Sequence, residues 1–173
     1  RQKIAYVPED RKALALDLHA YISNNITLGN MDQVGKHSLV DRKKEKDLCE
    51  QMVNKLRVKT PTIYQEVGNL SGGNQQKVVL AKWLGKGSDI MILACPTRGI
   101  DVGAKAEIYK LINELTAQGM AIVLISSELP EVMGMSDRLL IMYEGRVTGQ
   151  LLKEEYTEER VMEYATGRKV HNE

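Results

Sequence analysis

Apolar runs alternate with helical patterns along residues 87–173. Ile90 to Leu93 and Met120 to Ile125 are unbroken apolar runs, typical of strands that are buried on both faces. Between them, apolar residues recur at helical spacing: Ala104, Ile108, Leu111, Ile112 and Leu115. Gly119 is expected to end this helix. Strand, helix and strand in succession indicate an α/β fold with a mainly parallel sheet flanked by helices.

The remaining elements are predicted from the same signals. In the N-terminal part they are a strand over 4–7, a charged turn over 9–12, a short helix over 18–28, a loop over 29–38 and a helix over 40–56. The apolar face of the last helix is expected to hold Leu48, Met52, Val53 and Leu56. Further elements are a helix from Ser71 to about Gly85, a helix over 128–133, a strand over 139–143, its hairpin partner over 146–151 and a helix from Thr157.

Composition narrows the class of protein. The net charge is +1, from 24 basic and 23 acidic residues, so no bulk field favours nucleic acid as a partner. No apolar run approaches the roughly 20 residues that span a bilayer. Cys49 and Cys95 lack metal or redox spacing, and Cys49 is expected to be a small core residue. The three histidines, His19, His37 and His171, match no metal motif, so no metal ligand is expected.

The octet from Leu70 to Lys77, LSGGNQQK, is the strongest signal for chemistry. Two glycines at a helix N-terminus let backbone N–H groups approach an anion, and Ser71 can both cap the helix and donate its hydroxyl to a phosphate oxygen. A Ser-capped helix after a Gly turn would explain Ser-Gly-Gly alone. The whole octet resembles the signature motif of ABC ATPases, with Asn74 in place of the usual Gln, as is typical of their sugar-importer branch.

Other segments resemble the same family in the order that it requires. They are Ala5 to Glu9 as the Q-loop strand with Glu9 in place of Gln, Ile90 to Thr97 as Walker B, Arg98 to Asp101 as the D-loop, and Ile125 to Glu128 as the switch segment. The resemblance covers nearly all of residues 2–167 and is greatest to the second half of the double-length ATPases of ribose-, galactose- and xylose-type importers. It implies a partial ABC nucleotide-binding domain over 1–173, with a helical signature subdomain over about 13–86 and an α/β core over 1–12 and 87–173.

Several catalytic positions depart from the family. Ala94 stands where the family has its Walker B Asp, Cys95 where it has the catalytic Glu, and Ser127 where it has the switch His. No G-x-x-x-x-G-K-[ST] phosphate loop occurs in the chain, and in this family it would precede Arg1. A thiol is a poor base for activating water, and a role for Cys95 as nucleophile has no His near it in sequence. The chain's own catalytic site is therefore expected to be degenerate, and the chain alone inactive.

The family's geometry implies a role for the motif that remains. Two halves pair head to tail, and each ATP with its Mg²⁺ lies between one half's phosphate loop and the other half's signature motif. The residues expected to bind nucleotide in this way are Ser71, Gly72, Gly73, Asn74 and Gln75, with Gly99, Ile100 and Asp101 in the D-loop. A substitution such as Gly72→Asp is expected to block the phosphate while leaving folding largely unaffected.

The resemblance also implies partners and a place in the cell. The partners are the N-terminal half of the same polypeptide, membrane permease subunits and, indirectly, a sugar-binding protein, at the cytoplasmic face of the membrane. Three other readings stay open: a nucleoside-type importer half, a non-transport ABC protein of translation or DNA repair, and a free-standing regulatory pseudo-ATPase. In this family the strand that feeds the phosphate loop would precede Arg1 and lie between the strands at 120–125 and 139–143. A gap there, a repacked sheet or a strand borrowed from another chain is therefore expected.

Overall fold

A computed structural model describes residues 3–36 and 39–168. The chain forms two compact units, Arg1–Val123 and Leu124–Glu173. His37, His171 and the end of the predicted loop over 29–38 lie outside the described residues. The predicted division into a subdomain over 13–86 and a core stays a prediction.

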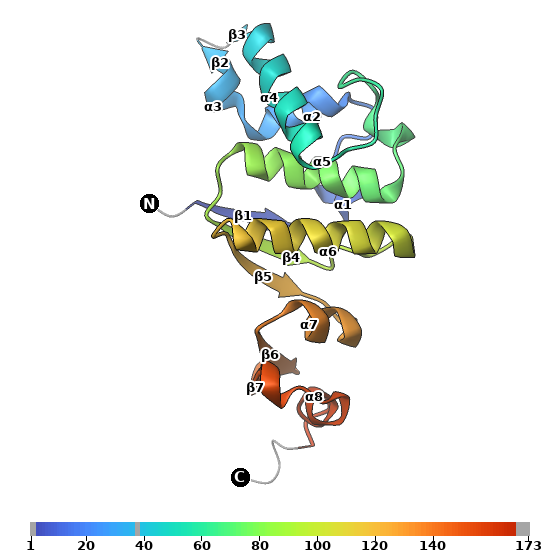
Figure 1. The fold of residues 1–173 in the computed structure, drawn as a ribbon, viewed down its shortest axis with the longest axis vertical. Helices are drawn as coiled ribbons and strands as arrows, with labels where there is room; N and C mark the ends of the chain where they lie inside the picture. Colours follow the sequence, from blue (N-terminus) through green and yellow to red (C-terminus); the bar gives the residue numbers. More distant parts are fainter. Residues whose placement is uncertain (1–2, 37–38, 169–173) are drawn as a thin grey trace. The chain divides into compact units, whose positions relative to one another are not determined.

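A three-stranded sheet forms the centre of the first unit, in the order β1 (Ile4–Val7), β4 (Ile90–Ala94) and β5 (Ala121–Ile125) (Figure 1). β1 and β4 are parallel, with Tyr6 opposite Ile92. Ala5, Val7, Met91 and Leu93 are fully buried, whereas Ile4 and Tyr6, on the other face of β1, are 60% and 52% exposed. The predicted strands are confirmed, and the sheet has one buried face.

β5 differs from its prediction as a strand buried on both faces. Its residues alternate between exposed and half-buried, and Val123 and Ile125 are each 50% exposed. β5 is an edge strand, as is β1, but it lacks the fully buried face that Ala5 and Val7 give to β1. An apolar run thus identified the strand correctly and its burial wrongly.

Two long helices of the first unit begin near each other, one at the predicted signature motif and the other at the predicted D-loop. α5 (Gly72–Gly85) packs against β1 and against α6 (Val102–Ala117). The inward face of α6 consists of Ile108, Leu111, Ile112 and Leu115, as the helical spacing predicted, and Gly119 follows with a φ of +92°.

The other face of α5 carries a helical layer. Its elements are α1 (Arg11–Leu14), α2 (Ile22–Gly29), α3 (Met31–Val34), α4 (Arg42–Lys55) and a short hairpin of β2 (Gly35–Lys36) with β3 (Leu39–Val40). α2 and α4 both pack on α5. Residues 29–36 contain α3 and β2, which corrects the predicted loop, and Leu48 is half-buried instead of facing the core. Cys49 is fully buried, which confirms its prediction as a core residue.

The second unit is a hairpin with two helices. It contains α7 (Leu129–Met135), β6 (Arg138–Tyr143), β7 (Arg146–Leu152) and α8 (Glu158–Ala165), and its core is built on Leu139, Ile141, Leu151 and Val161. β6 and β7 are antiparallel, joined through Glu144 and Gly145, which both have positive φ as a two-residue hairpin turn requires. Short 3-10 helices cover Val67–Asn69 in the first unit and Lys153–Glu155 in the second.

Among the described strands, β6 pairs with β7 in a sheet of its own. β5 and β6 therefore belong to different sheets, and the predicted cause, a missing strand between them, stays a prediction. No helix in the described parts of the chain is long and apolar enough to cross a membrane.

Candidate functional site

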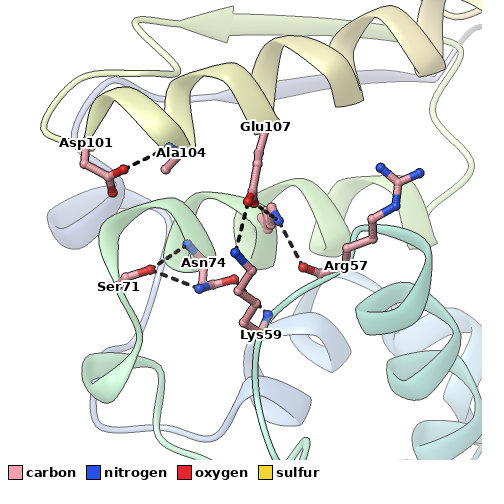
Figure 2. A network of polar contacts seen from close by, with 8 residues as sticks. Arg57, Lys59, Ser71, Asn74, Asp101, Ala104 and Glu107 are labelled. Carbon is pink, nitrogen blue, oxygen red and sulfur yellow. Dashed lines mark hydrogen bonds and ion pairs between the residues drawn. The ribbon is translucent and has the colours of Figure 1, made fainter.

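The N-terminus of α5 is built as the octet predicted. Ser71 is its N-cap, with extended backbone angles, and Gly72 is the first helical residue. The Ser71 Oγ accepts hydrogen bonds from the backbone N–H of Asn74, at 3.5 Å, and from its side-chain Nδ2, at 3.0 Å (Figure 2). Ser71 is exposed, so its hydroxyl stands at the surface of the first unit, at the positive end of a 14-residue helix.

The two glycines of the motif allow close packing inside the chain. A Cβ added at Gly73 would lie 2.5 Å from the Cβ of Ala104 in α6. One added at Gly72 would lie 2.8 Å from Nη2 of Arg11 and 3.1 Å from the carbonyl oxygen of Gly99. A side chain at Gly72 would therefore push against Arg11 and the D-loop backbone, which argues against the expectation that folding is left largely unaffected.

Arg11 holds the D-loop segment in place. Its Nη1 donates to the carbonyl of Arg98 at 2.8 Å and its Nη2 to that of Gly99 at 3.3 Å. Glu9 forms an ion pair with Arg98. Burial lowers the pKa of Arg11, although the charge of Asp10 acts in the opposite direction.

Arg11 is a residue that the sequence reasoning missed, since the run over 9–12 was predicted as a charged turn. Arg11 is 7% exposed. The charged residues around Arg11 did not indicate that its side chain would be buried.

The D-loop ends at the start of α6. Asp101 caps this helix by accepting from the backbone N–H of Ala104 at 2.9 Å, and Gly99 has a φ of +67°. Ile100 lies beside Gly72, since its Cγ2 would be 3.1 Å from a Cβ there. The structure thus brings together the predicted signature residues, the predicted D-loop residues and Glu9, all in the first unit.

Gln75 was predicted among the nucleotide-binding residues, and its side chain lies inside the unit. Its Nε2 donates to the carbonyls of Val67, at 3.3 Å, and Leu70, at 3.2 Å. The side chain therefore supports the segment that leads into the motif.

A polar network connects α5 to α6 next to the motif (Figure 2). Asn74 Oδ1 accepts from the backbone N–H of Lys59 at 2.8 Å. The Nζ of Lys59 lies 3.0 Å from Glu107 Oε1, and the Nζ of Lys77 lies 2.7 Å from Glu107 Oε2. Hydrogen bonds from Lys77 and Lys59 lower the pKa of the Glu107 carboxyl to about 2, and the bond from Lys77 has the larger effect. Lys77 also donates to the carbonyl of Arg57 at 2.9 Å.

The positions predicted as degenerate carry no group suited to Mg²⁺ or to a general base. Ala94 ends β4 and is 9% exposed, and Cys95 follows with a φ of +44°. Mg²⁺ takes oxygen ligands, which a methyl group and a thiol do not supply. Ser127 is exposed and lies in the second unit. Over residues 3–36 and 39–168, no group of His, Cys, Asp and Glu could hold a metal ion.

Comparison with solved structures identifies the fold. An ATP-binding cassette, solved as a dimer in a post-hydrolysis state with ADP and Pi, has a TM-score of 0.72 at 17% identity and covers 90% of this chain and 65% of its own. A transporter described as metal-chelate type, in an inward-facing conformation, has a TM-score of 0.81 at 16% identity, with coverages of 96% and 64%. The fold is therefore that of the ABC ATPase domain.

Comparison of sequences narrows the class further. A ribose import ATP-binding protein, RbsA from Oceanobacillus iheyensis, is 51% identical over 168 residues, which are 97% of this chain and 34% of that protein. A xylose import ATP-binding protein, XylG from Geobacillus kaustophilus, is 55% identical over 166 residues, 96% of this chain and 33% of that protein. No protein-family model matches. In sequence the chain matches the ABC-type ATP-binding proteins of sugar import, and it spans about a third of the length of these relatives.

Proposed function

We propose that the chain is part of the C-terminal nucleotide-binding half of a sugar importer's ATP-binding subunit, in which it contributes the signature motif to an ATP site completed by the N-terminal half. The relatives that it matches are named for ribose and xylose import. The observation that carries the proposal is a contrast within the first unit. An exposed, capped helix N-terminus with Ser71 at the surface occurs in the same unit as a strand end where Ala94 and Cys95 replace the acids.

The residues at the N-terminus of α5 suit the outer phosphate of ATP. N–H groups of the first helical turn have no partner within the helix, and the dipole of α5 favours negative charge there. Ser71 adds a hydroxyl, and Gly72 lets the start of α5 pack directly against Arg11 and the D-loop backbone. Such donors stabilise the charge that builds up on a transferred phosphoryl group. Bound Mg²⁺ would be held by residues outside this chain.

The D-loop would act beside the motif as a support. Arg11 donates hydrogen bonds to the carbonyls of Arg98 and Gly99. Asp101 caps α6, and Ala104 in the first turn of α6 packs against Gly73. The signature motif and the D-loop are thus in contact and form one surface. This surface would pair with the other nucleotide-binding half. Permease subunits, a sugar-binding protein and the cytoplasmic face of the membrane belong to the same proposal. No specific observation favours the nucleoside-type or regulatory alternatives.

Protection of a cysteine at position 71 tests the proposal. Ser71→Cys is introduced into the full-length subunit assembled with its permease, and alkylation of the peptide around residue 71 is followed by mass spectrometry. ATP, but not ADP, is expected to slow alkylation at least tenfold, because the motif becomes covered by the partner half's nucleotide. Equal alkylation with ATP, ADP and no nucleotide would show that the motif contacts no phosphate.

A further inference from the structure

The amide of Asn74 has one orientation that satisfies its neighbours. Its Oδ1 lies 2.8 Å from the backbone nitrogen of Lys59, and its Nδ2 lies 3.0 Å from Ser71 Oγ. A backbone N–H can only donate, so the amide oxygen must face Lys59. The amide N–H₂ then necessarily faces Ser71 and donates to it (Figure 2).

This orientation determines what the Ser71 hydroxyl can do. Its oxygen receives the side-chain Nδ2 of Asn74 at 3.0 Å and the backbone N–H of Asn74 at 3.5 Å. A hydroxyl has two acceptor lone pairs and one hydrogen. With donors of Asn74 directed at the oxygen, the hydrogen of Ser71 is left to donate to a third group, and an anionic oxygen is the acceptor that gains most from such a bond.

The network with Glu107 keeps the Lys59 backbone at the place where it fixes Asn74. The loop that contains Arg57 and Lys59 is bound at two points: Lys77, 4% exposed, donates to the Arg57 carbonyl, and Glu107 accepts from both Lys59 and Lys77. Lys77 and Asn74 are in the same helix. The segment that orients Asn74 is therefore attached to α5 by hydrogen bonds of both the backbone and the side chains.

From these contacts we infer that Asn74 is a positioning residue, which presets the hydroxyl of Ser71 as a hydrogen-bond donor to the phosphate chain of ATP. The inference rests on the proposed function, because it assumes that Ser71 meets a phosphate. It adds that the fifth residue of the motif, Asn74, acts through the second, Ser71. An Asp at position 74 would still accept from Lys59, but its second oxygen would take the hydrogen of Ser71 and turn the hydroxyl away from the ligand.

A double-mutant cycle tests the inference in the full-length subunit assembled with its permease. Ser71→Ala and Asn74→Ala are measured singly and together by ATP-dependent phosphate release. Ser71→Ala is expected to lower kcat roughly a hundredfold to a thousandfold, the range in which loss of one such donor falls, and Asn74→Ala is expected to lower it toward the same value. The double variant should be no slower than Ser71→Ala alone, because residues that act as one unit are not additive.

Asn74→Asp separates activity from folding. A carboxylate in the first turn of α5 favours the helix, so the melting temperature should be unchanged or higher, while kcat should fall at least as far as for Ser71→Ala. Thr157→Ala is the matched control, because it removes a Ser/Thr cap from α8 in the second unit and should leave kcat unchanged.

Each outcome of the cycle has one reading. If Ser71→Ala alone leaves kcat unchanged, the proposed function fails. If Ser71→Ala lowers kcat but Asn74→Ala does not, or if the two losses multiply in the double variant, the proposed function stands and the positioning role of Asn74 is overturned. If Asn74→Asp keeps full activity, the positioning role is overturned as well.

Discussion

The ammonium of Lys77 in α5 lies 2.7 Å from the carboxylate of Glu107 in α6. The lysine side chain is 4% exposed and that of Glu107 45%, so a buried cation reaches a half-exposed anion across the helix interface. Burying a charged group is costly unless it is paired and hydrogen-bonded. The Glu107 carboxylate therefore stabilises the packing of α5 on α6, because it neutralises the buried ammonium of Lys77.

Glu107→Gln is expected to destabilise the chain by about 1–3 kcal/mol, because Lys77 would keep its charge with the Arg57 carbonyl as its remaining strong acceptor. Urea denaturation followed by the fluorescence of Trp83, the one tryptophan, measures the change. Lys59→Met is the control: its side chain is 73% exposed, and loss of such a surface pair costs about 1 kcal/mol or less. An equal loss for both variants would contradict this assignment.

The same pair predicts a pH dependence. The pKa of Glu107 is lowered from 4.5 to about 2, so its contribution to stability is complete above about pH 4.5 and is lost as pH falls toward 2. The stability difference between the native chain and Glu107→Gln should therefore be constant near neutrality and shrink below pH 4.5. Because Glu107 is half-exposed, added salt should also reduce the difference. A difference that is the same at pH 3 and pH 7 would contradict the role of the carboxylate charge.

Gly73→Ala should destabilise the chain through contact between α5 and α6. Its Cβ would lie 2.5 Å from the Cβ of Ala104, and overpacking of this kind costs about 1–3 kcal/mol. Ala104→Gly removes that neighbour, so the double variant should recover part of the loss, offset by the lower helix propensity of Gly. Thermal unfolding of both variants measures this. No recovery in the double variant would place the strain elsewhere.

The two cysteines should differ in reactivity. Cys49 is fully buried, and burial raises the pKa of its thiol to about 11, so about one molecule in a thousand would carry the thiolate at pH 8. Cys95 is partly exposed. Iodoacetamide should alkylate Cys95 at least tenfold faster in the folded chain, as measured by peptide mass spectrometry, and the two should react similarly in urea. Similar rates without urea would indicate opening of the α2–α4 contact around Cys49.

The chain on its own should not hydrolyse ATP. It contains no phosphate-loop sequence, and Ala94, Cys95 and Ser127 supply neither a carboxylate nor an imidazole. Phosphate release from purified chain with Mg-ATP should stay at background, with Cys95→Ala indistinguishable from the native chain. Turnover that Cys95→Ala abolishes would show that the thiol takes part in catalysis.

Much of the fold was predictable because its signals are local. The N-cap at Ser71, the turn at Glu144 and Gly145 and the helical stripe of α6 depend on residues a few positions apart, and the structure confirms each of them. The resemblance of the motifs and their order to those of ABC ATPases also predicted the fold, which the solved structures confirm.

The sequence alone therefore determined most of the elements, the fold class and the helix N-terminus at Ser71, but not α1, α3 or β2. Tertiary structure decided what depends on distant neighbours. Arg11 is buried where the carbonyls of Arg98 and Gly99 accept from it, and β5 is half-exposed although all of its residues are apolar. The orientation of the Asn74 amide follows from the Lys59 backbone, 15 residues away. Periodicity records which side of a helix or strand is apolar, but it carries no information about which remote donor or carbonyl will meet a polar side chain there.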